Sequence, residues 1–167
     1  MRIQKILVTG ANGQLGWALS QAAKVTPNFE YIFLDRHAMD LSIPSELERI
    51  VELFAPSAII NAAAYTAVDK AESTPKNAFA INERAVAEIA RYCQKNNKRF
   101  LHFSTDYVFD GEKSSPYVES DLCEPLNIYG QSKLAGEHAI QEIFSKKENN
   151  EIQLHEAGAF FILRTTW

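Results

Sequence analysis

The stretch VTGANGQLGW, residues 8–17, constrains the fold of this chain more than any other, because it contains three of the seven glycines at even spacing. It follows the apolar run IQKILV (3–8) and leads into QLGWALSQAAKV (14–25), whose apolar residues recur with the period of a helix. A glycine-rich turn between a strand and a helix is typical of the first βαβ unit of a dinucleotide-binding sheet.

Each glycine of this GxxGxxG pattern has a distinct expected role. Gly10 would let the chain turn sharply off the strand, Gly13 would let the backbone approach a pyrophosphate, and Gly16 would let the helix pack close to the strand. The pyrophosphate would lie at the N-terminus of the helix, against free N–H groups. No GK[ST] follows, which excludes a P-loop. The pattern alone also fits a tight strand–helix turn with no ligand.

Strand-like and helix-like segments alternate along the rest of the chain. The patterns predict strands over 3–10, 31–35, 57–64, 99–105 and 157–167, and helices over 14–25, 42–56, 75–95 and 127–144. We expect a loop over 106–126 and a polar surface loop over 145–156. This alternation predicts an α/β fold with a Rossmann-like, doubly wound parallel sheet in three layers, α/β/α. We expect one NAD(P)-binding domain over 1–167.

Composition excludes several classes of function. The net charge of −4 gives no basic surface for nucleic acid or an anionic membrane. No apolar run is long enough to cross a membrane or to form a signal peptide, so we expect a cytoplasmic protein. The two cysteines form no CxxC and the four histidines no HxxxH, so we expect no metal site and no nucleic-acid or membrane partner.

An acidic residue follows the second predicted strand at the distance that the dinucleotide fingerprint expects. Asp35 comes 19 residues after Gly16, where a carboxylate would bind the adenosine ribose. Arg36 comes next, and an arginine there can pair with the 2′-phosphate of NADP(H). The sequence therefore leaves NADH and NADPH both open.

A second motif, YGQSK, places Tyr129 and Lys133 four residues apart on a predicted helix, so that both side chains share one face. An ammonium beside the phenol would lower the pKa of Tyr129, and the phenol could then donate a proton to a carbonyl oxygen. Ser104 and Thr105 end the fourth predicted strand, where a hydroxyl could polarise the same carbonyl. YxxxK alone also fits an ordinary exposed helix pair.

These features together resemble the extended short-chain dehydrogenase/reductase family. Within it, the stretches NAAAYTAVDKAE, STDYVFDG, PLNIYGQSKLAGE and LRTTW are similar to the dTDP-4-dehydrorhamnose reductases, in the same order along the chain. The resemblance implies NAD(P)H-dependent reduction of the C4 keto group of a dTDP-sugar, dTDP-4-dehydro-L-rhamnose, for polysaccharide synthesis. It also implies a homodimer as one expected assembly.

The resemblance assigns roles residue by residue. It implies a catalytic triad of Thr105, Tyr129 and Lys133. It implies a substrate pocket lined by Val68, Thr105, Tyr107, Tyr129 and Trp167. It implies cofactor contacts from Gly10, Asn12, Gly13, Gln14, Leu15, Asp35, Arg36, Asp40, Leu41, Ala62, Ala63, Ala64, Tyr65, Thr66 and Lys133.

Two departures from the family pattern leave alternatives open. Ala18 stands where some members carry a glutamate that contributes to a metal at a dimer contact, which argues against that metal and that dimer. Family members are also longer, so we expect the C-terminal substrate-binding part to be missing and the chain alone to be poorly active. The alternatives are another nucleotide-sugar epimerase or dehydratase, and a non-catalytic NAD(P)-binding regulatory subunit.

Overall fold

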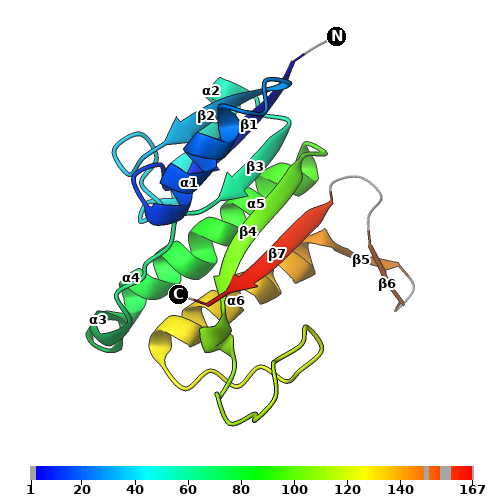
Figure 1. Ribbon diagram of the computed structural model, residues 1–167. Coiled ribbons are helices and arrows are strands. Elements are labelled where there is room, and N and C mark those ends of the chain that lie inside the picture. The colour runs from blue at the N-terminus through cyan, green and yellow to red at the C-terminus, as the bar shows by residue number, and fades with distance from the viewer. Residues whose placement is uncertain (1–2, 149–150, 155–158, 167) are drawn as a thin grey trace.

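Five parallel strands form the centre of the computed structural model, which describes residues 3–148, 151–154 and 159–166. The strands lie in the order β2-β1-β3-β4-β7, and every neighbouring pair is parallel (Figure 1). They are β1 (Gln4–Thr9), β2 (Phe29–Leu34), β3 (Ala58–Asn61), β4 (Arg99–Thr105) and β7 (Phe160–Thr165). The predicted doubly wound parallel sheet is therefore confirmed.

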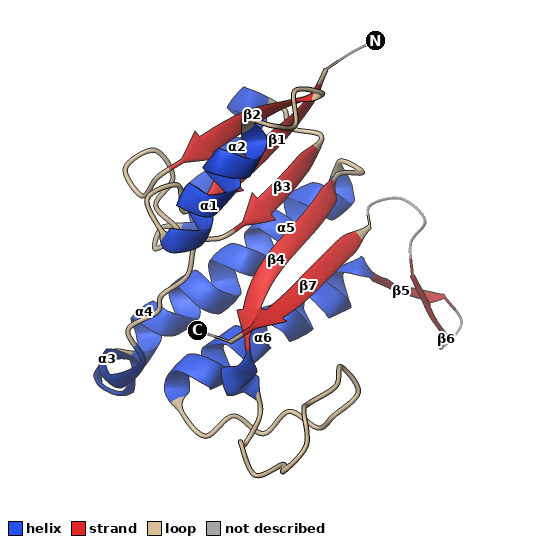
Figure 2. Ribbon diagram, viewed as in Figure 1, coloured by secondary structure: helices blue, strands red, loops and turns tan. Residues whose placement is uncertain are grey.

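Helices cover both faces of this sheet, as the three-layer prediction required (Figure 2). Helix α1 (Gln14–Ala23) lies on one face, while α2 (Leu47–Phe54), α5 (Ala85–Lys95) and α6 (Ile128–Phe144) lie on the other. The main core fills the space under α2, α5 and α6, where each fully buried aliphatic or aromatic side chain stabilises the fold by about 1.5–3 kcal/mol. Its members with fully buried, large side chains are Leu7, Leu47, Val51, Ile59, Ile89, Phe100, Ile140 and Phe144.

The helix predicted over 75–95 is interrupted in the structure. It consists of α4 (Pro75–Phe79), a π-helical turn over Ala80–Arg84, and α5. The turn lies where α6 crosses, and a Cβ on Gly136 would stand 2.1 Å from the backbone oxygen of Asn82. This close crossing accompanies the local widening of the helix, a type of irregularity that is frequent at functional sites.

Three further segments differ from their predictions. Residues 44–46 form a 3-10 turn (Pro44–Glu46) before α2, and the segment between the predicted strand 57–64 and the predicted helix 75–95 contains a short helix, α3 (Val68–Ser73). Part of the predicted loop over 145–156 forms a separate antiparallel hairpin of β5 (Ser145–Glu148) and β6 (Glu151–Leu154). Backbone pairing of two short polar segments needs no apolar face, so hydropathy does not reveal it. Among the described residues, no helix is both long and apolar enough to cross a bilayer.

Candidate active site

One cleft, of about 790 Å³, opens at the carboxyl ends of β1, β3 and β4. Because β1 and β3 are neighbours while the chain leaves them toward opposite faces of the sheet, this is the position where open α/β sheets bind ligands. Its lining includes all the predicted site residues except Asp35 and Trp167, and Trp167 lies outside the described residues. Other residues lining it are Met39, Ala67, Ile81, Phe103 and Ser104.

The glycine turn forms one end of the cleft. Gly10 adopts a φ of 73°, and a Cβ there would lie 2.9 Å from the backbone of Ala62. A Cβ on Gly16 would lie 2.2 Å from the Gly10 oxygen, whereas one on Gly13 would lie 3.3 Å from it. Gly13 is the N-cap of α1 and provides no side-chain cap. The first turn of α1 therefore faces the cleft without a side-chain partner, as an anion site requires.

Asp35 and its neighbours form a turn beside the glycines. The Asp35 carboxylate accepts hydrogen bonds from the backbone N–H groups of His37 and Ala38, both at 3.0 Å, and from Asn12 Nδ2 at 3.3 Å. These bonds, with that from Ala38 the strongest, hold the pKa of Asp35 below its usual value. Arg36 lies exposed on the cleft rim, 3.5 Å from Asp40. The carboxylate of Asp35 thus holds this turn, and its ribose contact stays a prediction.

The end of β4 and the start of α6 form the other end of the cleft. Asn127 caps α6 by accepting a hydrogen bond from the Gly130 N–H at 2.7 Å. A Cβ on Gly130 would lie 2.2 Å from the Tyr107 oxygen, so this helix begins directly against the turn that follows β4. The Tyr129 ring is buried and meets the Tyr107 ring edge-on, with 5.6 Å between ring centroids.

The pKa of Tyr129 shifts in the opposite direction to the sequence-based expectation. Burial raises the pKa of Tyr129, and the neighbouring Thr105 hydroxyl acts in the opposite direction. Lys133 is 2% exposed, and burial lowers its pKa to about 8. Its Nζ donates to the Phe103 backbone oxygen at 2.6 Å. The predicted lowering of the Tyr129 pKa by Lys133 is therefore wrong for this structure: burial dominates at Tyr129, and Lys133 is directed toward β4.

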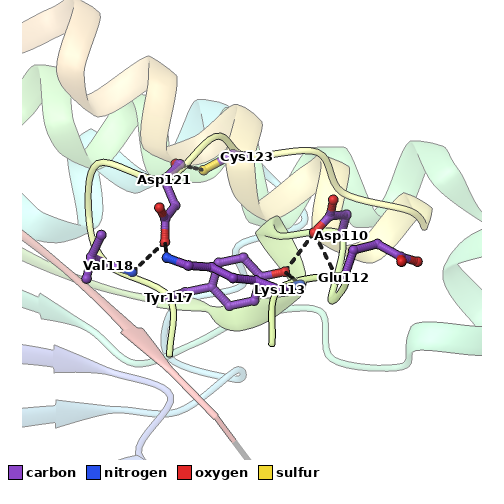
Figure 3. A network of polar contacts seen from close by, with 7 residues as sticks. All are labelled: Asp110, Glu112, Lys113, Tyr117, Val118, Asp121 and Cys123. Atoms are coloured by element: carbon purple, nitrogen blue, oxygen red, sulfur yellow. Dashed lines mark hydrogen bonds and ion pairs between the residues drawn. The ribbon is translucent and has the colours of Figure 1, made fainter. Parts of the chain in front are cut away.

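The loop that follows β4 carries a polar network of its own (Figure 3). Asp110 accepts hydrogen bonds from the Tyr117 hydroxyl at 2.7 Å and from the Glu112 N–H at 3.1 Å. The Lys113 ammonium pairs with Asp121. These contacts hold a segment without regular secondary structure beside a second, smaller hollow of about 290 Å³, which is lined in part by Tyr117.

Sequence reasoning missed the residue that joins the middle of the cleft, the loop after β3, to its α6 end. Asn82, in the π-helical turn, is 1% exposed. Its Oδ1 accepts from the Tyr65 N–H at 2.8 Å, and its Nδ2 donates to the Tyr65 oxygen at 3.0 Å and to Ser132 Oγ at 2.9 Å. Asn82 thus ties the loop after β3 to α6. An amide on the buried face of a predicted helix was the available signal.

Two more missed residues, Asn61 and His102, are fully buried on β3 and β4 beneath the cleft. A polar residue on the buried face of a predicted strand was the signal for each. The described residues contain no group of three or more histidine, cysteine or acidic side chains arranged to hold a metal.

Comparison with known proteins shows which family the chain belongs to. The chain is 46% identical over 163 residues to the dTDP-4-dehydrorhamnose reductase of Burkholderia thailandensis. This alignment covers 98% of the chain and 50% of the relative. It is 40% identical over 166 residues to the Escherichia coli protein of the same name, in an alignment that covers 97% of the chain and 50% of that relative. The chain therefore spans about half the length of these relatives.

Solved structures give the same relationship. The dTDP-4-dehydrorhamnose reductase of Bacillus anthracis, in complex with NADP, superposes with a TM-score of 0.85 at 34% identity, over 100% of this chain and 55% of that one. A UDP-glucose 4-epimerase from Brucella ovis, in complex with NAD, shares the fold alone, at 19% identity and a TM-score of 0.73. Residues 4–167 match the family described as the RmlD substrate binding domain, and the chain belongs to that family.

Proposed function

We propose that this chain is the cofactor-binding and catalytic part of a cytoplasmic reductase that uses NAD(P)H to convert dTDP-4-dehydro-L-rhamnose to dTDP-L-rhamnose for polysaccharide synthesis. One observation carries the proposal: a single cleft joins the uncapped N-terminus of α1 to Tyr129 and Lys133. The names of the relatives from Burkholderia thailandensis and Escherichia coli support the substrate.

The cleft fits a nicotinamide dinucleotide on several counts. Gly10 and Gly13 place no side chain at two positions of the turn that line the cleft, and the first turn of α1 offers N–H groups to a pyrophosphate. Small residues, Ala62 to Ala64, line the middle. Within the described residues, Ser104 Oγ is the one buried side-chain polar atom without a hydrogen-bond partner, and Ser104 lines the cleft. When bound, the cofactor would supply the hydride.

The chain's own residues would supply the proton. Since burial raises the pKa of Tyr129, its phenol holds a proton at neutral pH and can donate it to the C4 keto oxygen. Thr105 Oγ1 accepts from the Tyr107 N–H at 3.2 Å and donates to Asp106 Oδ1 at 3.2 Å, so its position is fixed from two sides. With substrate bound, this O–H would turn from Asp106 to the keto oxygen and stabilise the negative charge that develops there.

The substrate would enter beside Tyr107 and Val68. Both residues line the cleft, and the Tyr107 side chain is about half exposed. Val68 packs against the buried cluster of Ala71, Ala78 and Tyr129. A sugar seated between Val68 and Tyr107 would therefore lie next to the proton donor.

Isothermal titration calorimetry with NADPH tests whether the glycine turn binds the cofactor. Gly13→Val should weaken binding at least tenfold, because the side chain would occupy the place of the pyrophosphate. A Cβ at Gly13 would meet the Gly10 backbone oxygen at 3.3 Å, closer than an ordinary contact, so circular dichroism and a melting curve have to show that the variant is folded before its affinity is compared. Ala22→Val, an exposed change on the same helix away from the cleft, is the matched control and should bind as wild type. Equal affinity in the two variants would refute the assignment.

A further inference from the structure

Four buried polar side chains form a continuous series beneath the cleft, from β1 to α6. Thr9 Oγ1 donates to Asn61 Oδ1 at 2.6 Å, Asn61 Nδ2 lies 3.0 Å from His102 Nδ1, and His102 Nε2 lies 3.3 Å from Lys133 Nζ. None of the four residues is more than 2% exposed. Because water does not compete at such positions, the direction of each hydrogen bond matters for the protons that it holds.

Asn61 determines that direction. Its Oδ1 accepts a hydrogen bond from Thr9 Oγ1, and the Ala63 N–H is shared between that Oδ1 and Thr9 Oγ1, each at 3.3 Å. Rotating the amide would turn its NH₂ group toward the Ala63 N–H and would take the acceptor away from the Thr9 hydroxyl, so both contacts favour the oxygen on that side. The Nδ2 group therefore faces His102 and can only donate to it. It follows that His102 Nδ1 is an acceptor and that the neutral ring carries its proton on Nε2.

The proton on Nε2 points at Lys133. Burial, with a smaller contribution from the Lys133 charge, holds the pKa of His102 well below 6.5, so the ring is neutral at physiological pH. An Nε2–H can donate to the lone pair of a neutral amine, but it opposes an ammonium, which has only donors. The second polar contact of Lys133 Nζ is with the Phe103 oxygen, an acceptor that suits either form.

The other charged and titratable groups around Lys133 do not reverse this preference. Glu137, one turn further along α6, raises the pKa of Lys133, but burial outweighs it. The Glu137 carboxylate is itself paired at 2.7 Å with Arg164 of β7, which compensates much of its charge. Tyr129, on the same helix, holds its proton because burial raises its pKa.

We propose that His102 is a positioning residue whose Nε2–H donates to Lys133 and favours its neutral amine, and that Asn61 holds His102 in the tautomer required. The proposal rests on the proposed function, in which Tyr129 gives its proton to a keto oxygen. In the structure Lys133 Nζ contacts His102 and the Phe103 oxygen, so His102 acts on the protonation of Lys133 and not directly on Tyr129.

The tautomer can be measured on the chain without cofactor. In protein labelled with ¹⁵N-histidine, long-range ¹H–¹⁵N spectra report which ring nitrogen carries the proton, and His102 is assigned by the loss of its signals in His102→Gln. We expect the Nε2–H form. A proton on Nδ1 would overturn the proposal. The measurement itself is made on the wild-type chain, and His102→Gln is needed only to assign the signals.

The effect on Lys133 is measured by titrating the ¹³Cε signal, assigned with Lys133→Arg. His102→Leu removes the donor at similar volume and should raise the Lys133 pKa by about 1 unit, which is what one ordinary hydrogen bond is worth. His102→Gln carries an amide N–H of similar reach and should return the pKa toward the wild-type value. A rise of less than about 0.4 unit in His102→Leu contradicts the role of His102.

NADPH titration on the same samples separates the two proposals. If NADPH binds to the wild-type chain while His102 carries the Nδ1 proton, only the inference about His102 fails. If the tautomer and the Lys133 shift are as expected but NADPH does not bind, the proposed function fails and the hydrogen-bond series stands as a structural feature.

Discussion

Replacing Arg164 with methionine should lower the free energy of unfolding by about 3 kcal/mol, because it leaves a buried carboxylate without its partner. Glu137 on α6 is 1% exposed and accepts three hydrogen bonds from the Arg164 guanidinium, at 2.7, 3.1 and 3.2 Å. The pair joins α6, which carries Tyr129 and Lys133, to the edge strand β7.

The magnitude follows from the unequal burial of the two partners. Removing one member of a buried ion pair costs about 3–5 kcal/mol. The Arg164 side chain keeps 22% of its surface exposed, so water reaches part of the site and the lower end applies. Glu137→Met should cost less, about 1–2 kcal/mol, because the arginine left behind can turn toward water. The double variant should return to within about 1 kcal/mol of wild type, since no uncompensated charge is then buried.

Urea denaturation followed by circular dichroism at pH 7 measures all four proteins of this cycle. For a chain of this size, 3 kcal/mol corresponds to a melting temperature about 6–12 °C lower. Lys95→Met is the matched control: Lys95 pairs with Glu48 at 2.9 Å, but its side chain is 69% exposed, so the change should cost less than about 0.5 kcal/mol. A double variant as unstable as Arg164→Met would refute the reasoning.

Three further outcomes are expected. Arg36→Ala should weaken NADPH binding more than NADH binding in calorimetry, because it removes a charge near the 2′-phosphate; equal losses would contradict this role. Tyr129→Phe is tested in a chimera that continues after residue 167 with the C-terminal half of the Burkholderia thailandensis relative. The change should lower kcat for NADPH oxidation with dTDP-4-dehydro-L-rhamnose at least a hundredfold, with little change in cofactor affinity. A fully active variant would refute the role of Tyr129 as proton donor. Cys93, whose pKa burial raises to about 12, should resist a thiol reagent in the folded chain up to pH 9 and react only on unfolding, whereas early labelling would show that its site opens.

The sheet was predictable from the sequence because each strand is an apolar run with a clear end. The strand predicted over 3–10 ends at Gly10, and the structure ends β1 at Thr9. The uninterrupted helix over 75–95 was not correct, because the π-helical turn depends on the close approach of Gly136 to Asn82. That approach joins segments more than 50 residues apart, and no local pattern encodes it.

The site was predictable in membership but not in its internal contacts. The spacing of Tyr129 and Lys133 on one helix brought both to the cleft, together with Thr105. The partners of Lys133, His102 and the Phe103 oxygen, come from β4, and their distance from Nζ depends on how α6 packs on the sheet. The pKa of Tyr129 follows from the same packing, which is why the predicted direction of its shift was wrong.

The all-parallel order β2-β1-β3-β4-β7 also has a kinetic consequence. Three of the four neighbouring pairs are connected through a crossover, and β1 and β3 are separated by all of β2, so every strand contact closes a long loop before it gains any stabilisation. Among the described residues, the local β5–β6 hairpin lies outside this sheet and cannot nucleate it. Refolding should therefore be limited by these distant pairings, in the millisecond-to-second range typical of high contact order, with the apolar strands open to aggregation until α5 and α6 dock.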